Sequence, residues 1–323
     1  AVPDHRLDVL GELYHTQKIT HASLKFVDIA GLVKGASRGE GLGNRFLASI
    51  RECEAIVHVV RCFEDSNITH VEGSINPIRD IETINIELSL ADLESVSSRM
   101  EKTEKKAKQG DKESKAELEV LVKIKAKLEN GEPARSADLT DDEKKIASSL
   151  FLITTKPVIY ACNISESDLG KNEDDIKFVK DVKEFAKKEG SEVLVISAKV
   201  EQELTELDDD EKQMFLEDLG LKESGLDRII QIGYRLLGQI SFLTAGEKEV
   251  RAWTILKGSK APQAAGKIHT DFEKGFIKAE VVPYETLVEY GNYQAAKEAG
   301  KVRIEGKDYV VQDGDVMLFR FNV

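Results

Sequence analysis

An aspartate and a glycine three residues apart, Asp28 and Gly31, stand at the end of an apolar run and could serve a nucleoside triphosphate. In switch proteins that hydrolyse nucleotides, such an aspartate holds Mg²⁺, usually through water, and the glycine N–H reaches the terminal phosphate. Asp-x-x-Gly alone is a weak signal, and a structural turn is the alternative. Four more glycines follow between residues 32 and 43, which favours a loop that approaches phosphate closely.

A second polar cluster, Asn163 to Glu166, ends another apolar run. Guanine-specific switch proteins place Asn-Lys-x-Asp at such a strand end, where the aspartate accepts two hydrogen bonds from guanine. Here Ile164 stands in the lysine position, and Glu166 is one methylene longer than aspartate, so the bidentate interaction with guanine should not form. A backbone carbonyl could then read the amine of adenine. The cluster favours ATP over GTP, with a plain strand-end turn as the alternative.

A third cluster, Ser197-Ala198-Lys199, also follows an apolar run. In switch proteins a turn of this composition borders the base. The motif is too short to carry weight by itself, but the order of the three clusters and their shared place at strand ends support a common nucleotide site. We expect Asn163, Glu166 and these three residues to bind the base, and Asp28 to bind Mg²⁺.

The residue after Gly31 is Leu32, where a Ras-type enzyme carries the glutamine that orients the attacking water. Leucine cannot orient water, so another group must do so or turnover must be slow. His70 lies in a polar loop and is the candidate, with an ordinary surface histidine as the alternative. His58 lies inside an apolar run and is expected to be a core histidine. Catalytic roles are therefore assigned to Gly31 and His70 only.

The elements that would position these residues are short apolar runs separated by helical patterns. Runs that are apolar on both faces are typical of buried parallel strands. Their alternation with helices predicts an α/β fold with a doubly wound, mostly parallel sheet, whose ligands bind at the carboxyl ends of the strands. The predicted strands are Leu24–Val27, Ala55–Val60, Pro157–Cys162 and Glu192–Ile196.

An insertion separates the second and third strands, and its apolar spacing predicts two antiparallel helices around Gly110. Residues 101 to 127 hold nine lysines and six acidic residues, a surplus of positive charge on a chain whose net charge is −13. This surface is either a solvated hairpin or a basic arm that contacts RNA phosphates.

The part from residue 239 onward changes character and predicts a small mixed sheet around a helix. We therefore expect residues 1–83 and 150–238 to form a nucleotide-binding domain, residues 84–149 a helical hairpin, and residues 239–323 a separate C-terminal domain. The strands expected there are Val250–Ile255, Phe276–Val282, Val302–Ile304, Tyr309–Val311 and Val316–Phe321.

Composition excludes several classes of protein. No apolar stretch approaches the ~20 residues of a membrane span, so we expect neither a membrane partner nor a membrane location. Three cysteines without a paired framework fit a reducing, cytoplasmic compartment. The histidines and cysteines show no zinc spacing, and the acidic chain is not expected to bind DNA.

Taken together, these residues resemble the YchF family, the Obg-like ATPases among the translation-factor-related P-loop proteins. The resemblance covers essentially the whole chain and rests on "FVDIAGLVKGAS", "GEGLGN", "HVVRCFED", "NISE", "VRAWTI", "APQAAGKIHTDFEKGFIKAE" and "GKDYVVQDGDVMLFRFNV". It implies a P-loop nucleotide domain, the inserted hairpin and a C-terminal TGS domain of β-grasp type.

The resemblance also implies Mg²⁺-dependent hydrolysis of ATP to ADP, with adenine preferred through Asn163 to Glu166 and contacted by the backbone of Ile164. It implies association with rRNA and proteins of the ribosome, and a role in translation or stress responses. A binding module for RNA or the ribosome, without catalysis, is the alternative.

The chain departs from the family at its start. The resemblance implies a strand and a Walker A loop before Ala1, about forty residues with the phosphate-binding lysine and the Mg²⁺-binding hydroxyl. Without that loop, we expect the 323 residues alone to show little or no turnover.

Overall fold

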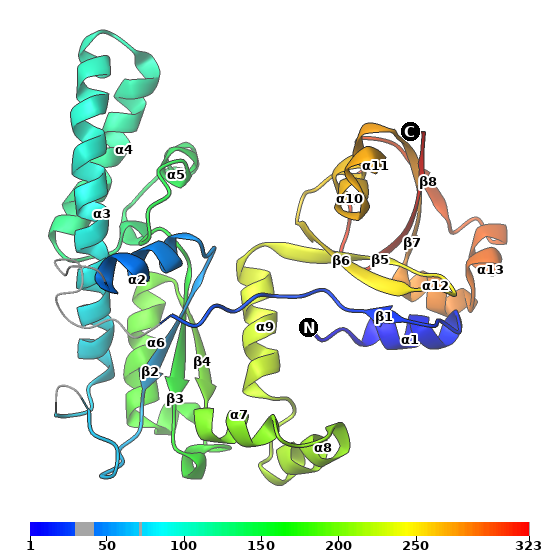
Figure 1. Cartoon of the computed structure of the whole chain (residues 1–323), viewed down its shortest axis with the longest axis horizontal. Coiled ribbons are helices and arrows are strands. Elements are labelled where there is room, and N and C mark those ends of the chain that lie inside the picture. Colours follow the sequence, from blue (N-terminus) through cyan, green and yellow to red (C-terminus); the bar gives the residue numbers. More distant parts are fainter. Residues whose placement is uncertain (30–41, 71–72, 323) are drawn as a thin grey trace. The chain divides into compact units, whose positions relative to one another are not determined.

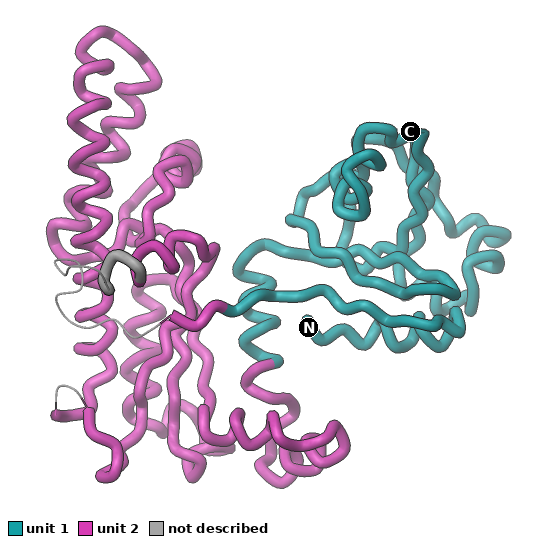
Figure 2. The backbone as a smooth tube through the Cα atoms, viewed as in Figure 1, with its two compact units in different colours: residues 1–26, 227–323 teal, residues 27–226 magenta. Residues whose placement is uncertain are grey.

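The structure is a computed structural model that describes residues 1–29, 42–70 and 73–322. The chain divides into two compact units (Figure 2). One unit contains Ala1–Phe26 together with Asp227–Val323, and the other contains Val27–Leu226. Each is described by itself below.

The unit formed by residues 27–226 contains a parallel sheet with the strand order β2-β3-β4 (Figure 1). Val60 lies opposite Cys162, and Cys162 lies opposite Val195, so all three carboxyl ends meet at one edge. The strands are β2 (Ile56–Arg61), β3 (Val158–Asn163) and β4 (Glu192–Ile196). They confirm three of the four strands predicted from apolar runs.

The central strand β3 is buried from Val158 to Cys162, because both of its edges are paired and helices cover the sheet. Val179 and Val182 of α6 pack against this sheet. Gly190 ends α6 in the left-handed region (φ 75°), which suits a glycine. The helices and turns of this part are α2 (Leu42–Arg51), η3 (Glu166–Asp168), η4 (Glu173–Asp175), α6 (Lys177–Glu189), α7 (Ala198–Leu204) and α8 (Asp209–Asp218).

The predicted helical hairpin is formed by α3 (Pro77–Lys108) and α4 (Lys112–Glu129), which lie side by side (Figure 1). Two short helices follow, η2 (Ala134–Ser136) and α5 (Asp141–Ser148). The first half of α3 packs near the sheet through Ile81 and Leu88, and the second half packs on α4 through Val96. The hairpin therefore begins in the middle of one continuous helix.

The strand predicted over Leu24–Val27 is wrong, because residues 21–29 form neither strand nor helix. Phe26 and Val27 are each 48% exposed instead of buried. An apolar run becomes a strand only where another strand completes its backbone hydrogen bonds, and no described strand pairs with this run.

The other unit contains a six-stranded mixed sheet in the order β1-β6-β5-β9-β7-β8. Strand β5 is antiparallel to β6 and parallel to β9, and β7 is antiparallel to β9. With α10 on one face, this is the β-grasp arrangement expected for the C-terminal part. The strands are β1 (Ile19–Thr20), β5 (Gln239–Thr244), β6 (Val250–Leu256), β7 (Phe276–Pro283), β8 (Arg303–Glu305) and β9 (Asp315–Phe321).

Both faces of this sheet are covered. Phe242 and Phe319 pack on α10, whereas Leu243 lies on the opposite face with Leu7 and Leu10 of α1. Tyr309–Val311 was expected as a strand but forms only one isolated bridge, between Val310 and Lys260. The helices are α1 (His5–Leu13), α9 (Gly225–Leu236), α10 (Ala261–Ile268), α11 (Thr270–Lys274), α12 (Tyr284–Tyr290) and α13 (Tyr293–Glu298).

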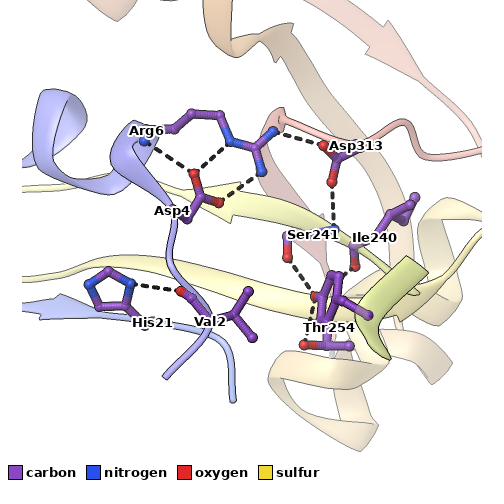
Figure 3. A network of polar contacts seen from close by, with 9 residues as sticks. Val2, Asp4, Arg6, His21, Ile240, Ser241, Thr254 and Asp313 are labelled. Atoms are coloured by element: carbon purple, nitrogen blue, oxygen red, sulfur yellow. Dashed lines mark hydrogen bonds and ion pairs between the residues drawn. The ribbon is translucent and has the colours of Figure 1, made fainter. Parts of the chain in front are cut away.

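The first residues of the chain are tied into this unit by a polar network (Figure 3). Arg6 forms ion pairs with Asp4 at 2.8 Å and with Asp313 at 2.9 Å, and these carboxylates raise the pKa of the guanidinium. Asp313 also accepts a hydrogen bond from the backbone N–H of Ser241 at 2.8 Å. The network groups residues 1–26 with the C-terminal part, although we expected residues 1–83 to belong to the nucleotide domain. The proposed domain boundaries stay a prediction.

Candidate functional site

The loops that follow β3 and β4 are joined at the carboxyl edge of the parallel sheet. Asn163 is the last residue of β3, and its Oδ1 accepts a hydrogen bond from the backbone N–H of Ala198 at 2.9 Å. Next to it, the N–H of Ile164 donates to the carbonyl of Ile196 at 2.8 Å. Two of the three predicted clusters therefore meet, because parallel strands end at the same edge.

Glu166 and Lys199 form a second link between the same two loops. The Lys199 Nζ lies 2.8 Å from Glu166 Oε2 and 3.9 Å from Glu203. The hydrogen bond with Glu166 raises the pKa of Lys199. Both side chains are exposed, so the pair contributes little to stability. The pair instead has an effect on geometry, because it places the carboxylate of Glu166 beside the ammonium group of Lys199.

Two of the predicted site residues have buried side chains. Ile164 is 3% exposed and packs in the core of the sheet, and Ser197 is 2% exposed. Ser197 is the N-cap of α7, where its side chain accepts from the N–H of Val200. The side chain of Ile164 is taken up by core packing and that of Ser197 by capping α7.

No described contact joins the residues that we expect to bind the phosphates and Mg²⁺ to those that we expect to bind the base. Gly31 and Leu32 lie outside the described residues. Asp28 is exposed, and within the described parts of the chain no hydrogen bond or ion pair joins it to Asn163, Glu166 or Ser197. One exposed carboxylate fits a Mg²⁺ ion that keeps its waters and takes its other ligands from phosphates. Residues 1–29, 42–70 and 73–322 contain no group of three or more His, Cys, Asp or Glu side chains placed to hold a metal.

His70 lies in the loop between β2 and α3, with its side chain 15% exposed. Its Nε2 is 2.8 Å from Oδ2 of Asp80, a residue in the first turn of α3. Sequence reasoning did not identify Asp80, and the available signal was an acidic residue in the first turn of the helix that follows the histidine. His58 lies in β2 beside Tyr160, with ring centroids 5.8 Å apart, which agrees with its expected place in the core.

The described part of the chain contains no helix long and apolar enough to cross a membrane. Its three cysteines are free thiols, and Cys62 and Cys162 are buried beside each other, which raises the pKa of the Cys62 thiol.

Comparison with protein families gives two matches. The profile of the C-terminal domain of YchF-type GTPases, described only as a protein of unknown function, matches residues 239–322. The profile described as 50S ribosome-binding GTPase matches residues 12–92, a range that includes Asp28, Gly31 and His70.

Two bacterial proteins, each named ribosome-binding ATPase YchF, align with the whole chain. The proteins from Bacillus subtilis and Escherichia coli O157:H7 are each 54% identical over 322 residues, which is 100% of this chain and 88% of theirs. The protein of the same name from Mycoplasma genitalium is 47% identical over 325 residues.

A solved structure has the same fold. The Schizosaccharomyces pombe YchF GTPase superposes with a TM-score of 0.87 at 40% identity, covering 99% of this chain and 86% of that protein. Its likeness extends over both compact units and confirms the expected α/β fold of the P-loop type with an inserted hairpin and a β-grasp domain. By sequence over its full length and by fold, this chain belongs to the YchF family.

Proposed function

We propose that this protein is an ATP-hydrolysing molecular switch that prefers ATP to GTP and associates with the ribosome. The observation that carries the proposal is the pair of links between the strand-end loops, Asn163 to Ala198 and Glu166 to Lys199. Together they form a base site at the carboxyl edge of the sheet, where nucleotides bind in folds of this class.

The preference for adenine must be argued from the site, because relatives carry the names ATPase and GTPase. Guanine needs a carboxylate that accepts from its N1–H and its 2-amino group. Oε2 of Glu166 is contacted by Lys199 at 2.8 Å, and the side chain is one methylene longer than aspartate, so its two oxygens would not both be placed for the two donors of guanine. Since the N–H of Ile164 is bonded to Ile196, the carbonyl of Ile164 is the group that would accept from the amine of adenine.

At the phosphate side, Asp28 would hold Mg²⁺ through water and the N–H of Gly31 would contact the γ-phosphate. Bound Mg²⁺ would neutralise charge that develops on the phosphate oxygens during transfer. With Leu32 in the place of a catalytic glutamine, His70 is the residue we assign to orient the attacking water. The base-side residues, Ser197 to Lys199 included, only fix the nucleotide.

The hairpin offers a surface for the ribosome. Lysines at its base are paired, as Lys123 is with Glu143 at 2.8 Å and Lys127 is with Glu132 at 2.8 Å. By contrast, six exposed lysines surround the tip, and within the described residues none of them forms an ion pair; they are Lys102, Lys105, Lys106, Lys108, Lys112 and Lys115. Unpaired lysines are suited to contact rRNA phosphates. We assign the C-terminal β-grasp domain as a TGS-type domain that supports such binding, in a cytoplasmic protein acting in translation or stress responses.

Nucleotide titration of the full-length protein in Mg²⁺ tests the base assignment. We expect ATP to bind at least about tenfold more tightly than GTP, which is about 1.4 kcal/mol. GTP binding that equals or exceeds ATP binding would overturn the preference. Phosphate release from ATP tests catalysis, and its absence with and without ribosomes would favour the alternative of a binding module.

Co-sedimentation with ribosomes over a series of salt concentrations tests the hairpin. Replacing Lys105, Lys106, Lys108 and Lys112 by glutamine should weaken binding and reduce the salt dependence, by about 0.7 to 0.9 in slope for each phosphate that the lysines no longer neutralise. Replacing the paired Lys125 and Lys127 is the matched control and should change the slope little. If both sets have the same effect, the tip is not the contact surface.

A further inference from the structure

The segment between β2 and His70 is tied together by Arg61, the last residue of β2. The guanidinium donates to the carbonyls of Phe63 at 3.2 Å, Asp65 at 3.4 Å and Ile68 at 3.2 Å. It also lies over the ring of Phe63, 4.8 Å from the centroid. Bonds from one rigid planar group to three carbonyls fix the path of the backbone up to two residues before His70.

Asp80 is held at the other side of His70. It lies in the first turn of α3, where its backbone N–H donates to the carbonyl of the N-cap residue Asn76 at 3.1 Å. Its two carboxylate oxygens have separate partners, since Oδ1 is 3.4 Å from Arg79 and Oδ2 is 2.8 Å from Nε2 of His70. The side chains of His70 and Asp80 are 15% and 23% exposed, so the contact is partly shielded from water.

A carboxylate beside Nε2 has a defined chemical effect on an imidazole. It can only accept a hydrogen bond, so it places the proton of the neutral ring on Nε2. A fixed tautomer would matter for a histidine that orients water, as in other enzymes where an acid fixes a histidine.

We propose that Asp80 is the positioning residue of His70, selecting its tautomer and ring orientation for hydrolysis. This inference rests on the catalytic role proposed above for His70. In this role Asp80 acts through the imidazole, while Arg61 ties down the segment before His70. If Asp80 had only a structural role, it would stabilise α3 through its interaction with the helix dipole.

The test is a double-mutant cycle on ATP hydrolysis by the full-length protein. His70→Ala removes the group assigned to orient the attacking water, so we expect it to lower kcat by about 10²-fold, the scale on which a positioned catalytic side chain contributes. Asp80→Asn should lower kcat by about tenfold and leave KM nearly unchanged, because the nucleotide contacts stay intact. In the double variant, the loss should equal that of His70→Ala alone, since Asp80 has no other route to the reaction. Glu82→Gln, on an exposed residue of the same helix, is the matched control and should leave kcat unchanged.

The ¹⁵N chemical shifts of the His70 ring give a readout that does not depend on activity. In the wild-type protein we expect the neutral ring to carry its proton on Nε2, and Asp80→Asn should produce a mixture of tautomers. If His70→Ala keeps full activity, the catalytic role of His70 fails and the inference fails with it. If His70→Ala is impaired while Asp80→Asn changes neither kcat nor the tautomer, only the role of Asp80 is wrong. Additive losses in the double variant would also overturn it.

Discussion

Arg135 and Glu189 form an ion pair at 2.8 Å with both side chains largely buried, 12% and 7% exposed. Arg135 lies in η2 at the base of the hairpin, and Glu189 is the last residue of α6. The same carboxylate accepts hydrogen bonds from the Tyr160 hydroxyl of β3 at 2.6 Å and from Ser191 at 2.7 Å. Burial, together with this carboxylate, raises the pKa of Tyr160. One acidic side chain thus links the base of the hairpin to the parallel sheet of the unit formed by residues 27–226.

Removing the cation should therefore destabilise the unit strongly. Arg135→Ala would leave the carboxylate of Glu189 buried without its charged partner, and breaking such a pair lowers the free energy of unfolding by about 3–5 kcal/mol. Urea denaturation followed by circular dichroism measures the loss. Lys145→Ala removes an exposed partner of Asp142 and should change stability by less than about 1 kcal/mol. Equal effects of the two variants would contradict a structural role for the buried pair.

Asp92 of α3 forms a second link, which joins this helix to the segment before β3. It is fully buried, and it accepts from the N–H groups of Ile153 and Thr154 at 3.0 and 2.7 Å and from the Thr154 hydroxyl at 2.6 Å. Asp92→Ala leaves these buried donors without an acceptor, so we expect a loss of about 2–4 kcal/mol on unfolding. Asp92→Asn keeps one acceptor oxygen and should lose less. A loss for Asp92→Ala that is within error of zero by urea denaturation would show that water replaces the carboxylate.

The sequence was sufficient to predict the elements that depend on patterns among neighbouring residues. Strands β2, β3 and β4 are short runs apolar on both faces, and burial between helices is the only stable place for such runs. Gly190 marks the end of α6 because the left-handed conformation there suits glycine. The meeting of Asn163 with Ala198 was predictable for the same reason, as parallel strands share an edge.

Features that depend on partners distant in sequence were not predictable. Leu24–Val27 has the composition of a strand, but composition does not supply a pairing partner. The pair of Arg135 with Glu189 depends on how η2 returns to the sheet, which no periodicity encodes. Strand β5 (Gln239–Thr244) was missed because its apolar residues continue directly from the helical pattern of α9.

Ile164 limits how the proposed base preference can be tested. Installing the lysine of guanine-specific proteins, by Ile164→Lys, would place a charge where the side chain is 3% exposed, and burying an unpaired charge is among the most destabilising changes known. We expect a loss of at least about 3 kcal/mol on unfolding. Thermal denaturation should show it as a much lower Tm. A variant with wild-type Tm would mean that the lysine reaches solvent.

Glu166→Asp is the usable probe of the same preference, because Glu166 is on the surface. Shortening the side chain should weaken its interaction with Lys199 and free a carboxylate at the length found in guanine-specific proteins. Stability should change by less than about 0.5 kcal/mol, while the ratio of GTP to ATP affinity rises. Nucleotide titration measures this ratio, and an unchanged value would contradict the base-reading argument.

His58 should make the stability of the unit formed by residues 27–226 depend on pH. Burial lowers the pKa of this imidazole to about 4 from an unperturbed value of 6.5. Between these values the unfolded chain binds the proton and the folded chain does not, so the contribution of His58 is complete above pH 6.5 and is lost as the pH falls toward 4. The loss would be about 3 kcal/mol. His58→Gln should remove this part of the decline when urea denaturation is compared at neutral pH and near pH 4.5.

The exposed His5 provides the control for that comparison. His5→Gln should leave the acid-induced decline as in the wild-type protein, because its ring is exposed and packs edge-on against Tyr284, with centroids 6.4 Å apart. Since many carboxylates also titrate in this range, the informative quantity is the difference between the two variants. If His58→Gln and His5→Gln decline equally, the imidazole in β2 is hydrated in the folded protein and does not oppose folding in acid.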